Sequence, residues 1–231
     1  MFRVIFLIQS KSSFNVILNF VFSKIKNFFF KKKIIMMKRN HQLLLSKKKI
    51  TNDYFSSHAF NFCYYLKKLN KDFNYLEIGS YEGNSAIFVA VNFLNSKVYC
   101  VDNWHKTEEY INHKDFLHIE ENFNYNTKNY KNVIKIKTNS DDFFFENKIN
   151  FDAIYIDGYH YGPQVYKDCK NAWKFLKKNG YLILDDFIWN FYKKNEDNPC
   201  FAINKFLKEI RQSYKIEKVS NSQIFIKKTV N

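Results

Sequence analysis

Glycine and proline are scarce in this chain, which has 5 glycines and 2 prolines among 231 residues. Such a composition excludes fibrous and low-complexity architectures. The 4 cysteines are widely spaced and form no CxxC pair. This spacing argues against a zinc site and a disulfide framework, and it favours a reducing compartment such as the cytoplasm. Hydrophobic residues make up 46% of the chain, enough for the core of one α/β domain.

Acidic residues are absent from residues 1–50, which contain ten Lys and two Arg. This segment, called the leader here, therefore carries +12 of the formal net charge of +15. The remaining 181 residues hold 25 basic and 22 acidic side chains and are nearly neutral. We therefore expect no nucleic-acid-binding face on the domain that follows the leader.

The leader is apolar as well as basic, but its apolar runs are short. The first uninterrupted run, Val4–Ile8, is too short for the core of a signal peptide, and lysines interrupt any membrane span. Two interpretations stay open. Residues 1–35 make weak contact with an anionic membrane surface as an amphipathic segment, or translation begins at Met36 or Met37.

Patterns typical of strands and helices alternate from residue 51 onward, so we expect residues 51–231 to form one domain and the leader to lie outside its core. The expected strands are 73–79, 97–102, 132–138, 151–157, 181–186, 214–220 and 222–228. The expected helices are 52–70, 84–95, 108–126, 140–147, 162–178 and 198–213. This alternation predicts an α/β fold with a Rossmann-like, doubly wound, seven-stranded sheet, whose last two strands form an antiparallel pair.

Acidic residues end four of the first five expected strands. They are Glu77, Asp102, Asp157 and the pair Asp185-Asp186, while Ser140 follows the remaining strand. One such acid alone is usually a helix cap or a solvated loop residue. Ligands of doubly wound sheets bind at the carboxyl ends of the strands, so the shared placement of these acids indicates a binding site.

The residues after the first strand favour one class of cofactor. Gly79 and Gly83 do not form the GxGxxG pattern of dinucleotide-binding proteins. A carboxylate at Glu77 would repel a pyrophosphate but would suit a ligand with an ammonium and a sulfonium group. Asp102 has the placement to bind ribose hydroxyls. This combination fits S-adenosylmethionine (SAM) better than NAD, which leaves a nicotinamide-dependent oxidoreductase and a non-catalytic binding module as less favoured alternatives.

Five segments give the chain a specific resemblance. They are YLEIGSYEGNSA, VYCVDNWHKTEEY, FDAIYIDGYHYGPQVYKD, GYLILDDFIW and the tail AINKFLKEI…SQIFIKK. In order and spacing, residues 73–228 resemble class I SAM-dependent methyltransferases, in particular metal-dependent O-methyltransferases of sugars and natural products. The resemblance implies methyl transfer to a small hydroxylated acceptor, with a sugar or glycoconjugate as the first choice. It implies that SAM is held by Glu77, Gly79, Ser80, Gly83, Asp102, Asn139 and Ser140.

The resemblance also gives a use for the paired acids in LILDDF. Asp157, Asp185 and Asp186 fall on positions where metal-dependent O-methyltransferases bind their metal, and three oxygen ligands suit Mg²⁺. The metal would lower the pKa of an acceptor hydroxyl. His160, three residues after Asp157, is expected to act as the catalytic base with Asp157 beside it. The plainer alternatives are acids that only end the sheet and a histidine that only caps the next helix.

Aromatic side chains near this edge are expected to stack on the acceptor: Tyr159, Tyr161, Trp104 and Trp189. A further histidine, His41 in the leader, is expected to be a surface residue.

Overall fold

The computed structural model describes residues 2–108 and 118–230. Its seven strands follow the order β3-β2-β1-β4-β5-β7-β6. β1, β2 and β3 are parallel, β4 and β5 are parallel, and β7 runs antiparallel to both β5 and β6. The strands are β1 (Asn74–Ile78), β2 (Lys97–Asp102), β3 (Val133–Lys137), β4 (Phe151–Ile156), β5 (Leu176–Leu184), β6 (Tyr214–Val219) and β7 (Ile224–Lys228). This topology confirms the predicted Rossmann-like fold with its antiparallel C-terminal pair.

The chain divides into two compact units, which are described separately. The central unit spans Phe30–Phe143, and the terminal unit comprises Met1–Phe29 and Phe144–Asn231. α7 (Ser140–Glu146) contains the boundary between them.

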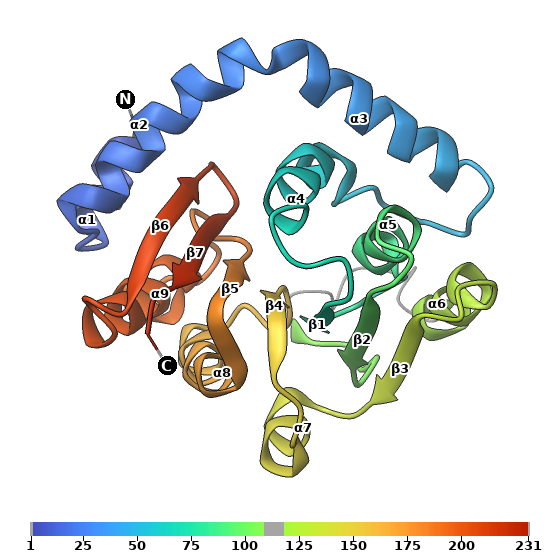
Figure 1. Cartoon of the computed structure of the whole chain (residues 1–231). Coiled ribbons are helices and arrows are strands. Elements are labelled where there is room, and N and C mark those ends of the chain that lie inside the picture. The colour runs from blue at the N-terminus through green and yellow to red at the C-terminus, as the bar shows by residue number, and fades with distance from the viewer. Residues whose placement is uncertain (1, 109–117, 231) are drawn as a thin grey trace. The chain divides into compact units, whose positions relative to one another are not determined.

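The central unit is built on β1 and β2, whose side chains are buried along most of their length. Such continuous burial is typical of parallel strands that are covered on both faces. In Figure 1, α4 and α5 lie over the same side of these two strands. The helices of this unit are α3 (Lys31–Leu45), η1 (Ser56–His58), α4 (Ala59–Leu66), α5 (Asn84–Asn92) and α6 (Ile119–Thr127).

His41, on α3, lies inside the central unit, so its prediction as a surface residue is wrong. Its side chain is 3% exposed and contacts the rings of Phe55 and Phe88 edge-on. His41 Nε2 lies 2.7 Å from Asn84 Oδ1, at the start of α5. The ring is buried because it joins α3 to α5, a long-range contact that the local sequence does not reveal.

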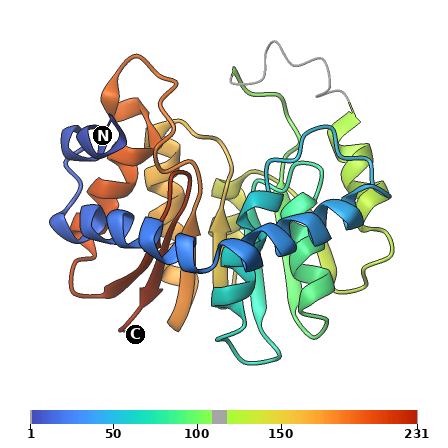
Figure 2. The same cartoon turned by 90° about the horizontal axis from the view of Figure 1, so that it is seen from above.

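The terminal unit places its helices on two sides of β6 and β7. They are α1 (Phe2–Gln9), α2 (Phe14–Phe29), α8 (Gly162–Phe175), η4 (Asn195–Asp197) and α9 (Pro199–Glu209). Figures 1 and 2 both show α2 on one side of these strands and α8 on the other. Val16 and Phe20 of α2 are at most 1% exposed and form part of the core under this helix.

The first part of the leader makes polar contacts with the terminal unit as well. Asn204 Nδ2 donates to the Ser10 carbonyl over 3.0 Å, and Lys218 Nζ donates to Asn27 Oδ1 over 2.7 Å. Burial and, to a smaller extent, the nearby charge of Lys26 together lower the pKa of Lys218 to about 8. The leader was predicted to lie outside the core of the domain formed by residues 51–231. How much the terminal unit loses in stability without these contacts tests that prediction.

The boundary between α8 and β5 differs from the prediction. The expected helix 162–178 ends at Phe175, and β5 begins at Leu176, which pairs with Phe151 of β4. Leu176 is only 2% exposed, so burial in the sheet overrides the helical pattern of its neighbours. A side chain at Gly180 would lie 2.7 Å from the Asp152 carbonyl, so a glycine is needed where the two strands approach each other.

Two other expected helices are shorter than predicted. Only α4, preceded by the single turn of η1, occupies the range 52–70. In the range 108–126, α6 begins at Ile119, and the expected residues 109–117 lie outside the described part of the chain.

Candidate active site

A glycine-bounded loop joins β1 to α5. Gly79 and Gly83 have φ angles of 86° and 82°, a left-handed conformation that strongly favours glycine. A Cβ at Gly83 would also lie 3.1 Å from side-chain carbons of Phe123 and Thr127. No side chain caps the first turn of α5. Its free N–H groups therefore offer a binding position for an anionic group of a ligand.

Glu77, at the end of β1, is completely buried and only half satisfied. Tyr75 donates its hydroxyl proton to Glu77 Oε2 over 3.0 Å. Among the described residues, Glu77 Oε1 has no hydrogen-bond partner, and neither does the buried hydroxyl of Ser80. Burial raises the pKa of Glu77 to about 7, and the polar side chains around it offset this rise only in part. A cationic N–H donor would satisfy the free oxygen and restore the charge.

Asp102 holds the loop after β1 from the neighbouring strand. Its Oδ2 accepts the backbone N–H groups of Ser80 and Tyr81, each over 2.9 Å, and its Oδ1 accepts that of Trp104 over 2.7 Å. Burial raises the pKa of Asp102, and these backbone donors oppose the rise. The carboxylate therefore fixes the shape of the loop, while its predicted contact with ribose stays a prediction.

Asn139 forms the start of α7. Its Oδ1 accepts the backbone N–H of Asp142 over 2.8 Å, and its Nδ2 donates to Asp142 Oδ2 over 2.6 Å. This is the geometry of a helix cap. The predicted contact of Asn139 and Ser140 with the adenine of SAM stays a prediction.

Glu82 is a residue of the loop that the sequence analysis missed. It is completely buried, and it accepts the Thr51 N–H over 2.7 Å, the Thr51 hydroxyl over 2.6 Å and Asn122 Nδ2 over 2.8 Å. The side chain thus ties the loop both to residue 51 and to α6. Its position beside a glycine is typical of a solvated acid, and nothing in the local sequence indicates these distant partners.

A second group of polar side chains lies in the terminal unit, after β4 and β5. His160 Nε2 lies 3.0 Å from Asp186 Oδ2 and 3.5 Å from Asp157 Oδ1. One ligand atom of each residue lies within 4.8 Å of the others. The φ angle of Asp186 is 49°, so its carboxylate is presented from a left-handed backbone position. The structure therefore brings together three of the residues predicted to carry chemistry.

Asp185, the other member of the acid pair, is turned toward protein donors. Its Oδ2 accepts hydrogen bonds from the Tyr155 hydroxyl and from Gln223 Nε2, the latter over 2.7 Å. Its Oδ1 accepts the backbone N–H of Asp186 over 2.8 Å. Tyr155 and Gln223 were not predicted, because one points out of β4 and the other precedes β7, far along the chain. Asp185 as a third metal ligand stays a prediction.

Asp157 and Asp185 lie close together and share one hydroxyl donor. The Tyr155 hydroxyl lies close to both Asp185 and Asp157, at 2.8 Å from Asp157 Oδ2, but it has one proton to donate. Withdrawal from water and then repulsion by Asp185 raise the pKa of Asp157 to about 8, although 31% of its side-chain surface remains exposed. A divalent cation would relieve this repulsion, so the residues present fit Mg²⁺.

Aromatic rings surround His160 on the terminal unit. The Trp189 ring lies 5.1 Å from His160 and stacks on Phe191 at 5.1 Å. Tyr161 contacts Tyr192 at 5.5 Å. Phe191 and Tyr192 extend the set predicted from sequence. Trp104, also predicted, is buried in the central unit instead and donates its Nε1–H to the Tyr81 carbonyl over 2.8 Å.

One of the comparisons with known proteins identifies a family. Residues 76–187 match the family model described as a methyltransferase domain. A search of curated proteins finds no match.

Solved structures share the fold at low sequence identity. The chain is similar to the O-methyltransferase TomG from Streptomyces achromogenes, involved in tomaymycin synthesis and bound to SAM, with a TM-score of 0.58, 10% identity, and coverage of 84% of this chain and 90% of that one. It is also similar to an O-methyltransferase from Bacillus cereus in complex with SAH (TM-score 0.57, 13% identity, coverage 93% and 100%). A third is the precorrin-6y C5,15-methyltransferase from Geobacter metallireducens (TM-score 0.55, 14% identity, coverage 78% and 92%). At these identities the likeness shows the fold and leaves the acceptor open.

Proposed function

We propose that the chain is a class I SAM-dependent methyltransferase that transfers a methyl group from SAM to a hydroxyl oxygen of a small acceptor. The match of residues 76–187 to the model of a methyltransferase domain supports this proposal. The observation that carries the assignment of the methyl donor is the free, completely buried Oε1 of Glu77. A buried carboxylate oxygen is costly unless it is paired. The ammonium group of SAM supplies the charge and the N–H groups that this atom lacks.

The central unit would bind and orient the methyl donor. SAM, when bound, supplies a methyl group on a reactive sulfonium. Glu77 would accept the ammonium, and the uncapped first turn of α5 would receive the carboxylate. Asp102 keeps the loop in shape through its backbone hydrogen bonds, and it would use its remaining lone pairs for the ribose hydroxyls.

The terminal unit would activate the acceptor. Mg²⁺, when bound, supplies a Lewis acid that lowers the pKa of a hydroxyl group. Asp157 and Asp186 would hold the ion, and Asp185 would keep Asp186 in position through its hydrogen bond with the Asp186 N–H. His160 Nε2 would take the hydroxyl proton, since an imidazole titrates near neutral pH.

A sugar or glycoconjugate is the acceptor class that we propose. The rings of Trp189, Phe191 and Tyr192 gather beside His160, and aromatic faces of this kind can stack on the apolar face of a sugar. The proposed metal and base beside these rings suit an acceptor hydroxyl, whose proton has to be removed before transfer.

The proposal is tested by measuring methyl transfer from SAM with a panel of sugar nucleotides, glycosides and catechols, with added Mg²⁺ and with EDTA. We expect turnover on at least one hydroxylated acceptor, its loss in EDTA, and its return when Mg²⁺ is added in excess. Binding of SAM, followed by calorimetry, should be largely unaffected by EDTA. Full turnover in EDTA, with no metal found by elemental analysis, would remove the metal from the mechanism.

The nicotinamide alternative is separated by thermal shift. SAM should raise the melting temperature, because it binds only the folded state, and NAD at the same concentration should not. A shift with NAD alone would contradict the assignment of the methyl donor.

A further inference from the structure

α2 has two opposite apolar faces, and the described residues cover only one of them. Val16 and Phe20 pack into the terminal unit. The other face carries exposed apolar side chains, called the α2 stripe here: Phe14, Leu18, Val21, Phe22, Ile25, Phe28 and Phe29. Their exposure ranges from 37% at Leu18 to 78% at Phe29. At 100° per residue they span roughly 120° of the helix surface, which is the width of an apolar face that contacts another phase or protein.

Exposed apolar side chains are concentrated here to an unusual degree. Elsewhere in the described chain they occur mostly as separate residues, such as Leu94 and Phe145. Single exposed apolar residues are normal, whereas a contiguous apolar face with a polar border marks an interaction site. We therefore expect the α2 stripe to bind another surface.

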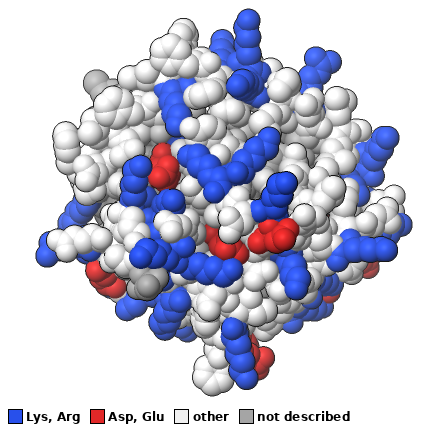
Figure 3. All heavy atoms as spheres, viewed as in Figure 1, with Lys and Arg blue, Asp and Glu red and all other residues white. Residues whose placement is uncertain are grey.

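The charges around the stripe favour an anionic occupant. Residues 1–29 contain Arg3, Lys11, Lys24 and Lys26 and no acidic residue, and three more lysines follow at 31–33. On the face of the molecule shown in Figure 3, basic side chains are numerous and acidic ones are few. A second copy of this chain would bring the same cations against themselves. An anionic lipid surface would attract them.

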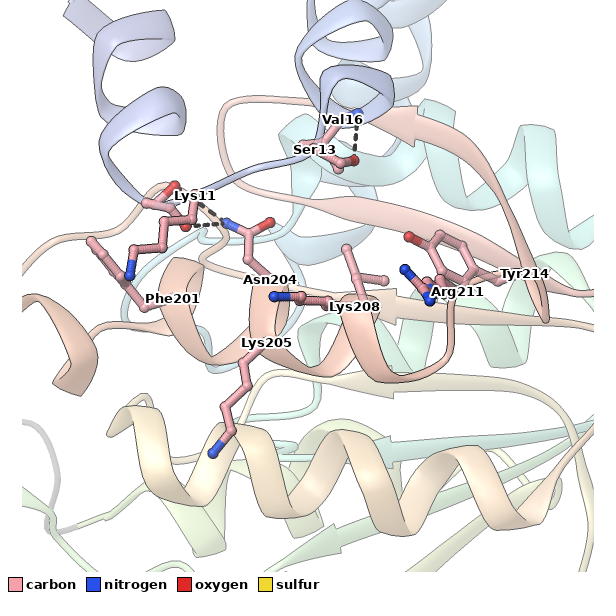
Figure 4. Close-up of a pocket in the computed structure, with 11 residues that line it drawn as sticks. Lys11, Ser13, Val16, Phe201, Asn204, Lys205, Lys208, Arg211 and Tyr214 are labelled. Carbon is pink, nitrogen blue, oxygen red and sulfur yellow. Dashed lines mark hydrogen bonds between the residues drawn. The ribbon is translucent and has the colours of Figure 1, made fainter.

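A basic pocket opens beside the start of the stripe. It has a volume of about 610 Å³ and lies between the link from α1 to α2 and the helix α9. Figure 4 shows the side chains of Lys11, Lys208 and Arg211 around it, with Asn204 hydrogen-bonded to the link and Tyr214 beside Arg211. The buried side chains of Val16 and Leu207 complete the lining, which contains no acidic residue.

The cations of the pocket are available to a ligand. Among the described residues, Lys11, Lys208 and Arg211 have no ion-pair partner. Lys11 has a φ angle of 58°, so the link from α1 to α2 presents it from a left-handed position. Lys205 differs, because its Nζ lies over the Tyr166 ring at 4.3 Å and, in Figure 4, points away from the link. Three cations around a partly apolar cavity match a phosphate attached to an apolar molecule.

We propose that the α2 stripe docks on an anionic phospholipid bilayer and that the basic pocket holds the phosphate of a lipid headgroup. Ser13 lines the pocket, and Phe14, the first residue of the stripe, follows it directly and is 75% exposed. The helix lies along the surface of the bilayer, with its apolar stripe at the level of the headgroups and upper acyl chains. Within residues 2–108 and 118–230, no helix combines the length and apolar composition of a membrane span.

Co-sedimentation of the full chain with vesicles tests the proposal. Vesicles of phosphatidylcholine mixed with phosphatidylglycerol should bind the protein, and high salt should weaken the binding. Vesicles of phosphatidylcholine alone should bind it far less. The triple variant Phe14→Ser/Phe22→Ser/Phe29→Ser should lose at least about tenfold in binding for each ring removed, because each buries most of a large apolar side chain in the bilayer. Phe145→Ser is the matched control, since its ring is 91% exposed and lies outside the stripe.

The pocket is tested with Lys208→Gln/Arg211→Gln. A cation near an anionic surface strengthens binding roughly fivefold, so this variant should bind about 25-fold more weakly. Lys174→Gln/Lys178→Gln removes the same charge elsewhere on the terminal unit and should retain most of the binding. All substituted side chains are exposed at least in part, and circular dichroism should show unchanged folding.

Three results would overturn the proposal. The first is the absence of binding to anionic vesicles at low salt. The second is equal binding by the stripe variant and by Phe145→Ser. The third is a dimer in size-exclusion chromatography that the stripe variant converts to a monomer without any vesicle binding, which would make a second copy the occupant. If Lys208→Gln/Arg211→Gln bound anionic vesicles as strongly as Lys174→Gln/Lys178→Gln and the unsubstituted chain do, the role of the pocket would be overturned.

Discussion

Replacing Glu77 with Gln should change the stability of the protein and its affinity for SAM in opposite directions. In the absence of SAM, the buried carboxyl has a pKa of about 7, compared with an ordinary value of 4.5. The folded state therefore holds this proton more tightly than the unfolded state. The contribution of Glu77 to the free energy of unfolding is therefore fully present below pH 4.5 and is lost as the pH rises through 7. Glutamine has nearly the same shape and does not titrate, so the variant lacks this loss.

The size of the effect follows from the shift in pKa. One pKa unit corresponds to about 1.4 kcal/mol, so the full shift is worth about 3 kcal/mol, of which about 2 kcal/mol develops between pH 5.5 and 8. Urea unfolding at these two pH values measures it as the difference between the variant and the unsubstituted protein. That difference should grow by about 2 kcal/mol in favour of Glu77→Gln. Glu121→Gln, a substitution at an exposed carboxyl on α6, should show no such growth.

Affinity for SAM should move the other way. Glu77→Gln removes the negative charge that faces the ammonium, so binding should weaken at least tenfold, or about 1.4 kcal/mol, at pH 8. In the unsubstituted protein, binding should strengthen as the pH rises toward 7, and in the variant it should not. Calorimetric titration at pH 6 and pH 8 measures both. Two results would refute the role given to the free oxygen of Glu77. One is a free energy of unfolding that changes equally with pH in the variant and in the unsubstituted protein. The other is an unchanged affinity of the variant for SAM.

Four further predictions test other parts of the site. Asp102→Asn should weaken SAM binding at least tenfold and lower the free energy of unfolding by about 1–3 kcal/mol. The reason is that an amide nitrogen cannot accept the backbone N–H groups of the loop. An unchanged SAM affinity by calorimetry and an unchanged urea unfolding curve would contradict this. His160→Ala should retain SAM binding, lose roughly 10²–10⁴ in kcat and recover in part at high pH, where the acceptor ionises unaided; an unchanged kcat would exclude it as the base. Asp186→Asn should raise the Mg²⁺ concentration needed for half-maximal turnover, whereas an unchanged requirement would place the metal elsewhere. A protein that begins at Met37 should still bind SAM, because the predicted SAM ligands all follow residue 76, but it should melt several degrees lower than the full chain, because Val16 and Phe20 no longer cover the terminal unit. An unchanged melting temperature would show that α1 and α2 do not stabilise the fold.

The strands and the placement of the acids were predictable because both depend on local patterns. β2 has the predicted bounds, and its buried run ends at Asp102 as expected. The antiparallel pair of β6 and β7 was also recognisable from two short alternating segments with a turn between them. Parallel strands are uniformly apolar, so a charge at the end of one is conspicuous in the sequence.

The features that were missed depend on contacts between distant residues. Leu176 follows a helical pattern, and only its burial against β4 makes it part of a strand. Glu82 and Gln223 look like ordinary loop residues, and their partners lie about 30 to 40 positions away along the chain. The two apolar faces of α2 also required the structure, because an apolar sequence does not show which of its residues remain uncovered.

The hydrogen bonds of Asp185 have an evolutionary consequence. Tyr155 on β4 and Gln223, directly before β7, both donate to the same carboxylate oxygen. If Asp185 were replaced by an apolar residue, Gln223 Nε2 would lose its carboxylate partner and the Tyr155 hydroxyl would keep only its contact with Asp157, so such a change should be best tolerated together with changes at the other two positions. Among relatives of this chain, positions 155, 185 and 223 should therefore vary as a set. Gln223→Leu should be rescued in part by a compensating substitution at 185, although 38 residues separate the two positions along the chain.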